Sequence, residues 1–338
     1  MKSVFVSSPN ITHIFKALSE AFQSSVKVLA NQNYRIEIPK QIGEGFIEGY
    51  EYSCGIRYIN YNCQFYDDVE LVFAPSLYKL LYFFYVVEGK FTTILNQNLI
   101  YKFNPYQSTI LNHPSTDSFS IHFKRYIRVN INCLSIDTYT FLESRKYDAD
   151  LNIHLKNLFN FTNDNMIHHC HYDLQLLEVY QNINSFEGKD FFKIIYAEGK
   201  LLELITIHLQ EYLRSMEYPL PPHYLTPYEI ENLKRIPDLI DNNLAKRPKI
   251  KWFAQEIGMN SNKLQKGFQE LYKETVNSYI QKKRLSSSKK LLVTTNLNIC
   301  EIIGELGLTS KSHFSKIFKE KYHMSPSEYR KKFKKGLN

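Results

Sequence analysis

The sequence between residues 298 and 319 reads NICEIIGELGLTSKSHFSKIFK. Its apolar residues recur every three or four positions, stop at Gly307, and resume at Phe314 with the same spacing. This periodicity predicts two short amphipathic helices. Gly307 suits the end of the first helix because glycine accepts the left-handed backbone conformation at little cost. Asn298 and Glu301 have the spacing of a capping box, so the stretch predicts a helix-turn-helix.

The same pattern occurs about 50 residues earlier, where residues 249–269 read KIKWFAQEIGMNSNKLQKGFQ. The matched pairs are Phe268/Phe318, Tyr272/Tyr322 and Tyr279/Tyr329, each 50 apart, and Ile250/Ile299, Phe253/Ile302, Ile257/Leu306 and Gly258/Gly307, each 49 apart. Such self-similarity marks a repeated structural unit. We expect Val276–Leu292 to form one helix connecting the two copies, and Thr309 to cap the second helix of the later copy.

Polar side chains occupy the outer face of the second helix in each copy. The candidate DNA-binding residues are Ser261, Asn262, Lys263, Gln265 and Lys266 in the first copy, and Lys311, Ser312, His313, Ser315 and Lys316 in the second. A helix-turn-helix places this helix in a major groove. There Lys can reach guanine acceptors or phosphates, and Asn and Gln can pair with adenine. The alternative for each residue is a solvated surface without a base contact.

Length and charge favour two domains with different partners. The chain has 338 residues with 43% hydrophobic and 22% charged residues, which argues against a disordered chain and suggests about two domains. Residues 229–338 carry 23 Lys and Arg against 11 Asp and Glu, a net charge of +12, while the other 228 residues carry 19 and 23, a net −4. A basic final third joined to a mildly acidic remainder predicts a module that binds a polyanion.

Four prolines between residues 218 and 228 predict an extended linker. We therefore expect a ligand-sensing and dimerisation domain at 1–217 and a DNA-binding domain at 229–338. Within the first, residues 50–141 are rich in aromatic and β-branched residues, which predicts a small β-barrel or sandwich. Leu80–Val87 and Phe91–Leu95 flank a hairpin signal, and further turn signals fall at 96–98 and 112–115. The aromatic residues either line a ligand pocket or form the core.

Residues 150–217 are expected to be mainly helical, with helices at Asp173–Ile183 and Asp190–Met216. Every seventh residue of the longer segment is apolar: Ile195, Leu202, Leu209 and Met216, with Ile205 and Tyr212 between them. Such a stripe fits a coiled-coil seam between two copies of the chain. It fits equally well a helix packed on its own domain.

Signals for metal binding or catalysis are weak. His168, His169, Cys170 and His171 are adjacent, so their side chains diverge on a regular helix or strand and do not form a ligand set. His113 and His122 lie in the β-rich region without the pattern of a metal-dependent barrel enzyme, and no nucleophile or phosphate-loop motif occurs. We expect no cofactor, metal or catalytic residue. Five cysteines without a C-x-x-C pair, no membrane span and no secretory signal predict a cytoplasmic protein.

Residues from about Ile236 to Phe333 resemble the DNA-binding domain of the AraC family of bacterial transcription regulators. The resemblance rests on residues 299–319 together with Met324-Ser325-Pro326-Ser327-Glu328-Tyr329-Arg330. It implies an α+β protein: an N-terminal β-rich, cupin-like barrel with helices, then an all-α domain with two helix-turn-helix units joined by a long helix. The departures from the family pattern are Ile303 for Ala, Leu308 for an aromatic, His323 for Gly, and Lys249 at a capping position.

A narrower resemblance links residues 258–271 and 197–204 to the siderophore-responsive, pyochelin regulator-like subgroup, whose ligands are ferric siderophores. The sequence therefore predicts a ligand-responsive transcription activator, and the subgroup resemblance implies iron-uptake genes as its targets. It predicts double-stranded DNA, a small effector, RNA polymerase and a second copy of the chain as partners. Other readings are a regulator of a sugar or lipid response, a catalytic barrel with a DNA-targeting domain, and a DNA-coating protein without sequence choice. The sequence does not identify the residues that bind the effector.

Overall fold

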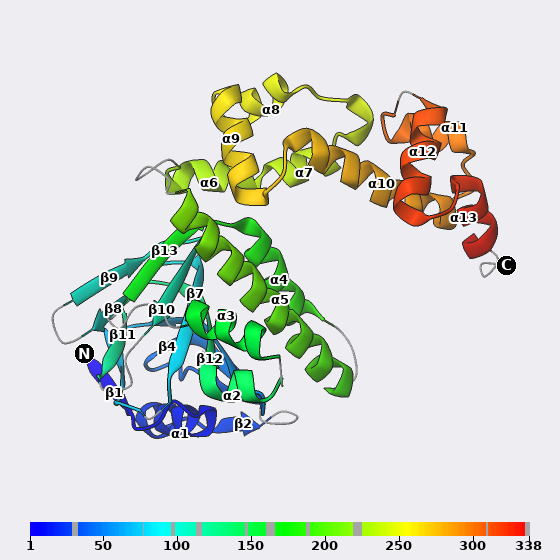
Figure 1. Cartoon of the computed structure of the whole chain (residues 1–338). Helices are drawn as coiled ribbons and strands as arrows, with labels where there is room; N and C mark the ends of the chain where they lie inside the picture. Colours follow the sequence, from blue (N-terminus) through cyan, green and yellow to red (C-terminus); the bar gives the residue numbers. More distant parts are fainter. Residues whose placement is uncertain are drawn as a thin grey trace. The chain divides into compact units, whose positions relative to one another are not determined.

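The computed structural model describes residues 1–28, 33–76, 78–95, 99–112, 117–145, 148–159, 166–186, 190–218, 225–308 and 310–334. The chain divides into two compact units, Met1–Pro221 (unit 1) and Pro222–Asn338 (unit 2), which are described separately (Figure 1). Residues 219–224 of the expected linker lie outside the described residues, as do the expected turn at 96–98 and His113.

Unit 1 contains two β-sheets, coloured from blue to green in Figure 1. The five-stranded sheet has the order β1 (Lys2–Val6), β6 (Val69–Phe73), β11 (Phe119–Phe123), β8 (Phe91–Leu95) and β9 (Leu99–Phe103). The eight-stranded sheet has the order β13 (Met166–Tyr172), β10 (Gln107–Asn112), β7 (Leu80–Glu88), β12 (Val129–Asp137), β5 (Ile56–Phe65), β4 (Gly43–Glu51), β3 (Asn33–Glu37) and β2 (Val26–Val28).

One hydrophobic core joins the two sheets. Leu71 and Phe119 of the first sheet and Tyr61 and Phe84 of the second belong to the same buried cluster, and helix α1 (Ile11–Phe22) adds Phe15. Buried and half-buried residues alternate along β6 and β8, as expected for strands with one face on a core. Two sheets packed in this way are the double-sheet arrangement to which cupins belong. The predicted aromatic core is therefore present.

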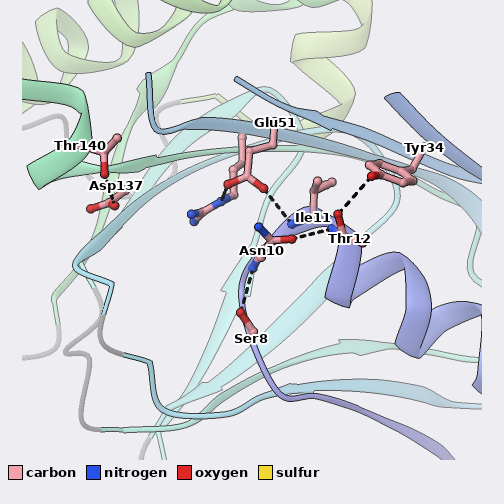
Figure 2. A network of polar contacts seen from close by, with 9 residues as sticks. Ser8, Asn10, Ile11, Thr12, Tyr34, Glu51, Asp137 and Thr140 are labelled. Carbon is pink, nitrogen blue, oxygen red and sulfur yellow. Dashed lines mark hydrogen bonds and ion pairs between the residues drawn. The ribbon is translucent and has the colours of Figure 1, made fainter. Parts of the chain in front are cut away.

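A polar network holds the start of helix α1 against the second sheet (Figure 2). The Asn10 side chain caps the helix by accepting the backbone N–H of Thr12 at 2.9 Å, and the Glu51 carboxylate of β4 accepts that of Ile11 at 3.0 Å. Glu51 also accepts from Nε of Arg57 on β5 at 2.5 Å. The N-terminus of α1 is thus attached to two neighbouring strands of the eight-stranded sheet.

The predicted hairpin between residues 80 and 95 is wrong, although both strands form. β7 pairs with β10 on one edge and β12 on the other, so neither edge is open to β8. β8 instead pairs with β9 and β11 in the other sheet. The turn between β7 and β8 thus carries the chain from one sheet to the other, and a local turn signal does not distinguish these outcomes.

Strands also form outside the expected β-rich region. β1 to β3 and most of β4 (Gly43–Glu51) precede residue 50, and β13 lies within the segment expected to be helical. These strands contain many polar residues, such as the histidines of β13, which weakens the apolar pattern that marks a strand. The helices of unit 1 after α1 are α2 (Thr138–Glu143), α3 (Ala149–Phe159), α4 (Leu174–Ser185) and α5 (Asp190–Glu217). The last two confirm the helices predicted at 173–183 and 190–216.

The predicted heptad stripe on α5 is buried in its middle and exposed at its ends. Ile205, Leu209 and Tyr212 are buried within unit 1, whereas Ile195 and Met216 near the helix ends are 54% and 57% exposed. Packing on its own unit therefore accounts for the middle of the stripe only. Among the described residues, no helix is long and apolar enough to cross a lipid bilayer.

Unit 2 consists of helices in all of its described regular structure (yellow to red in Figure 1). They are α6 (Pro227–Lys234), α7 (Ile236–Asp241), the 3-10 turn η1 (Leu244–Lys246), α8 (Ile250–Glu256), α9 (Ser261–Tyr272), α10 (Val276–Thr294), α11 (Ile299–Glu305), α12 (Lys311–Tyr322) and α13 (Pro326–Phe333). With the sheets of unit 1, this confirms the α+β class and the predicted connecting helix.

Unit 2 begins before the expected end of the linker. Leu225 is buried, and Thr226 forms a capping box with Glu229 at the start of α6. Leu225 and Leu233 also lie against Gly267 of α9, where an added Cβ would be 2.8 Å from Leu233 Cδ1. The segment 225–228, expected to be linker, is therefore part of the folded helical unit.

Candidate nucleic-acid interface

The two repeats predicted from the sequence fold alike. α8 and α11 are each seven residues long, α9 and α12 are each twelve, and the latter two are followed by a left-handed residue, Lys273 or His323. Gly258 and Gly307 occupy the two turns with φ of 64° and 63°. Each α8–α9 or α11–α12 pair is thus a helix-turn-helix of the same design.

Equivalent aromatic clusters lie behind the second helix of each copy. In the first, the ring centres of Phe268 and Tyr272 are 4.3 Å apart, and both rings contact Tyr279 of α10. In the second, Phe318 and Tyr322 are 4.6 Å apart and both contact Tyr329 of α13. The 50-residue sequence repeat therefore holds α9 and α12 by the same three-ring contact.

Caps at the turn of the second copy largely follow the prediction. Asn298 and Glu301 form a reciprocal capping box at the start of α11. Thr309 lies outside the described residues, and the N-cap of α12 is Ser310, whose hydroxyl accepts the backbone N–H of His313 at 3.2 Å. Lys249 gives α8 no side-chain cap, as expected. Ile303, which is larger than the alanine of the family pattern, belongs to the buried core together with Leu285 and Phe314.

On α9, the structure exposes three of the five candidate DNA-binding residues: Asn262, Gln265 and Lys266. Ser261 is half-buried. Lys263 is also half-buried, and its ammonium group donates to Glu229 Oε1 at 2.5 Å. Burial opposes ionisation of Glu229, but hydrogen bonds from Lys263 and Thr226 outweigh it and lower the pKa of the Glu229 carboxyl. Lys263 therefore fastens α9 to α6 in addition to the DNA contact predicted for it.

On α12, four of the five candidate residues are exposed: Lys311, Ser312, His313 and Lys316. Ser315 is half-buried. Phe314 and Phe318 are fully buried and pack α12 on the core of unit 2. The structure thus exposes four of the five candidates on α12.

Helix α10 separates the two recognition surfaces and contacts α9 near its start and α11 and α13 near its end (Figure 1). Its 19 residues span about 28 Å at the usual rise of an α-helix. Successive major-groove segments on one face of DNA are about 34 Å apart. Several of its basic residues are engaged internally: Lys282 with Glu274, Lys283 with Asp241, and Arg284 with the Leu244 carbonyl. Lys289 and Lys290 are exposed.

Residues 253–332 match a protein-family model described as a helix-turn-helix domain. Unit 2 carries a helix-turn-helix domain. The matched range runs from within α8 to within α13 and so includes both helix-turn-helix units. Lys311 and Lys316, like their counterparts on α9, are within this range.

The chain is similar to three regulators over different lengths. It is 33% identical over 91 residues to the xylose operon regulatory protein of Escherichia coli strain K12, covering 27% of this chain and 23% of that protein. It is 32% identical over 105 residues to the regulatory protein PchR of Pseudomonas aeruginosa, covering 31% and 35%. It is 25% identical over 216 residues to the HTH-type transcriptional regulator GadX of Shigella flexneri, covering 63% and 73%. The chain thus spans about a quarter to a third of the first two relatives.

The adjacent histidines of β13 have separate partners. The ladder between β10 and β13 is irregular between Gln107 and Thr109, so the strict alternation of side chains expected for β13 is interrupted. His168 bonds Ser215 at 2.7 Å, His169 bonds Thr109 at 2.9 Å, and His171 pairs with Glu211 at 2.9 Å. These three histidines hold β13 to β10 and α5 and do not converge on a shared ligand position.

Sequence reasoning missed a buried Ser–His–Tyr chain in unit 1. His208 of α5 bonds Ser108 Oγ of β10 at 2.7 Å through Nδ1 and Tyr180 OH of α4 at 3.0 Å through Nε2. A serine and a histidine at this distance are typical of a nucleophile and its base. Ser108 and His208 are both fully buried, however, so no substrate reaches them in this structure. The contact ties three elements together and gives no support to the catalytic-barrel alternative.

Proposed function

We propose that this chain is a sequence-specific DNA-binding transcriptional regulator, an activator, in which unit 1 senses a small molecule. The observation that carries the proposal is the pair of equivalent helix-turn-helix units, each presenting exposed polar residues on its second helix. The net charge of +12 over residues 229–338 favours binding to the phosphate backbone. RNA polymerase is the partner through which such an activator would act, and the cytoplasm is its site of action.

A substitution at Lys316 tests whether helix α12 recognises the base sequence of the DNA. We expect Lys316→Ala to weaken binding to the operator, a DNA site selected from random sequences with the parent protein, by about tenfold. The reason is that an exposed lysine on the recognition helix can bond base edges. Binding to random DNA should change much less. Fluorescence anisotropy at several salt concentrations measures both affinities.

Lys290→Ala is the matched control, since Lys290 is exposed on α10 outside the recognition helices. Removing the Lys290 side chain should weaken binding to all DNA sequences equally. If Lys290 contacts a phosphate, the slope of log affinity against log salt concentration should also decrease by about one. A regulator should prefer its operator to random DNA by about 10³ or more. Equal affinities would support a DNA-coating protein instead, and equal losses on both DNAs for Lys316→Ala would show that this residue reads no base.

We also propose that the chain forms a homodimer through α5. Ile195 and Met216, at the two ends of the heptad stripe, are more than half exposed, and so are Phe192 and Leu213, each three residues before one of them. In an antiparallel pair with a two-fold axis at the middle of the helix, the first apolar end of one copy meets the last apolar end of the other. The exposed ends are thereby covered by the same surface of a second copy.

Leu213→Glu tests the dimer because it places a charge in this apolar contact. We expect a loss of at least about tenfold in dimer affinity, measured by sedimentation velocity, since an unpaired charge is costly to bury. Gln210→Glu adds the same charge at an exposed position beside the stripe and should leave the dimer intact. A monomeric parent protein, or equal losses for both variants, would contradict the proposal.

The similarity to PchR supports a finer proposal, that the regulated genes serve iron uptake and that the signal is a ferric siderophore. A ligand at 100 times its dissociation constant adds about 2.7 kcal/mol to the stability of the domain that binds it. Differential scanning calorimetry of the full chain with ferric siderophores, and with sugars and fatty acids as controls, measures this shift. A shift with a sugar or fatty acid in place of a siderophore would contradict the iron proposal and leave DNA binding unaffected.

A further inference from the structure

The loop between α7 and α8, residues 242–249, leads into the first helix-turn-helix but also contacts the second one. It contains the 3-10 turn η1, which lies against α11 of the second copy. Leu244 of η1 packs on the hydrophobic core that α10, α11, α12 and α13 form together. The α7–α8 loop is therefore a second connection between the two copies, in addition to helix α10.

Hydrogen bonds hold the α7–α8 loop to the second copy and to α10. Nη2 of Arg247 donates to the carbonyl oxygen of Leu308, in the turn between α11 and α12, at 2.7 Å. Nη2 of Arg284, from the middle of α10, donates to the carbonyl oxygen of Leu244 at 3.1 Å. Bonds with a charged donor are stronger than those between neutral groups. The turn of the second copy is thus attached to the loop, and the loop is attached to α10.

The path from this contact to α8 is short and restricted. Arg247 has a left-handed backbone, with φ of 51° and ψ of 52°, which is costly for a residue with a Cβ. Such a conformation persists where surrounding contacts compensate for it, and the bond to Leu308 is one of these contacts. Pro248 follows with a φ fixed by its ring, and α8 begins two residues later at Ile250. Few rotatable bonds therefore separate α8 from the turn of the second copy.

Two connections restrict the relative movement of the copies more than one does. Helix α10 is joined to α9 through residues 273–275 and to α11 through residues 295–298, and both connections contain rotatable backbone bonds. The α7–α8 loop links the same two copies on a different path, because α8 contacts α9 and η1 contacts α11. A rotation of one copy about the end of α10 would break the bond between Arg247 and Leu308. The loop therefore helps to fix the separation and relative direction of α9 and α12.

We propose that the α7–α8 loop sets the spacing at which the two recognition helices read DNA, with Arg247 as the positioning residue. The inference rests on the proposed DNA-binding function and goes beyond it, because it assigns spacing specificity to residues outside the recognition helices. One added base pair moves the second DNA element by about 3.4 Å and turns it by about 35°. Copies held in advance fit one spacing only, and less ordering is needed when they bind.

Operators with altered spacing test the proposal on the full chain. The elements read by α9 and α12 are located as the operator positions at which Gln265→Ala and Lys316→Ala change the sequence preference. One base pair is then inserted or deleted between them, and fluorescence anisotropy gives the ratio of affinities for the original and altered operators. We expect a loss of about thirtyfold for the parent protein, comparable to one mismatched base pair. Equal affinity of the parent protein for all spacings would overturn the proposal.

Arg247→Gln removes the guanidinium group and keeps a polar side chain. We expect the loss on altered operators to shrink to about fivefold, because the copies can then adjust to a new spacing. Affinity for the original operator should fall by about threefold, since the copies must be ordered on binding. Lys246→Gln is the matched control: it removes the same charge from an exposed residue of η1 and should retain the thirtyfold loss. A thirtyfold loss in Arg247→Gln would overturn the proposal.

A direct phosphate contact is the alternative role for Arg247. In that case Arg247→Gln would weaken binding to the original and altered operators by the same factor. The slope of log affinity against log salt concentration would also decrease by about one, and this pair of results would overturn the positioning role. The ratio of affinities compares two DNAs with one protein sample, so an inactive fraction of a variant cancels.

Leu244→Ala tests the same contact if Arg247→Gln does not fold. It leaves every charge in place and removes the packing of η1 on the second copy. The loss on altered operators should again become smaller than in the parent protein, and an unchanged loss would overturn the proposal. Failure of the proposed function gives a different result, in which the parent protein has the same affinity for the operator and for random DNA.

Discussion

Gly307→Ala is expected to lower the free energy of unfolding of unit 2 by about 3 kcal/mol, against about 1 kcal/mol for Gly258→Ala. Both glycines have a φ close to 64°, so both substitutions carry the strain of a left-handed alanine. They differ in their surroundings. A Cβ at Gly307 would lie 2.4 Å from the Leu244 carbonyl oxygen and 2.9 Å from that of Ala245, whereas a Cβ at Gly258 meets nothing within 4 Å.

The difference arises because the carbonyl groups of η1 lie against Gly307, whereas Gly258 has no such neighbour within 4 Å. Arg247 donates to the Leu308 carbonyl at 2.7 Å, and Arg284 donates to the Leu244 carbonyl at 3.1 Å, so both sides of this contact are held in place. The backbone therefore cannot move away from an added methyl group without breaking hydrogen bonds. Urea unfolding of the full chain, followed by the fluorescence of Trp252 in unit 2, measures both variants. Equal losses would show that the contact with η1 yields easily.

The helix-turn-helix units could be predicted from sequence because their determinants are local. Capping residues, the turn glycine and the three- or four-residue apolar spacing all act within about twenty positions, and the repeat supplied the glycine and the apolar spacing twice. The caps illustrate the limit of this reasoning: Asn298 was identified, but Ser310 caps α12 where Thr309 was expected. Choosing between neighbouring hydroxyl residues requires the path of the turn, which sequence spacing does not specify.

Contacts between residues far apart in the sequence could not be predicted in the same way. The partner of β8 is decided by which strand edges remain free, and both edges of β7 are taken by strands distant in the sequence. Arg247 donates to the Leu308 carbonyl although 61 positions separate the two residues. Lys263 matched the pattern of a DNA-binding residue, and only the position of α6 shows that it also pairs with Glu229. Each of these outcomes depends on tertiary packing, for which the sequence contains no short-range signal.

His208 is expected to make unit 1 less stable in mild acid. Burial lowers the pKa of His208 to about 3, against an opposing effect of the nearby Glu211 charge, so the folded imidazole is neutral down to about that pH. In the unfolded chain the same group takes up a proton below about pH 6.5. Between these values the unfolded state binds more protons, and stability therefore falls as the pH falls. The loss attributable to His208 is about 2 kcal/mol at pH 5 relative to pH 7.5.

His208→Gln tests this assignment because glutamine offers polar atoms to Ser108 or Tyr180 and does not titrate. Urea unfolding at pH 7.5 and pH 5, followed by circular dichroism, should show a smaller pH effect in the variant by about 2 kcal/mol. His13→Gln removes an exposed histidine of α1 from the same unit and serves as the control. The lowered pKa values of His168 and His169, both caused mainly by burial, contribute equally in all three proteins and cancel in the comparison. The same pH effect in the parent protein and His208→Gln would mean that His208 is protonated in the folded state, and the neutral Ser108–His208–Tyr180 chain would have to be abandoned.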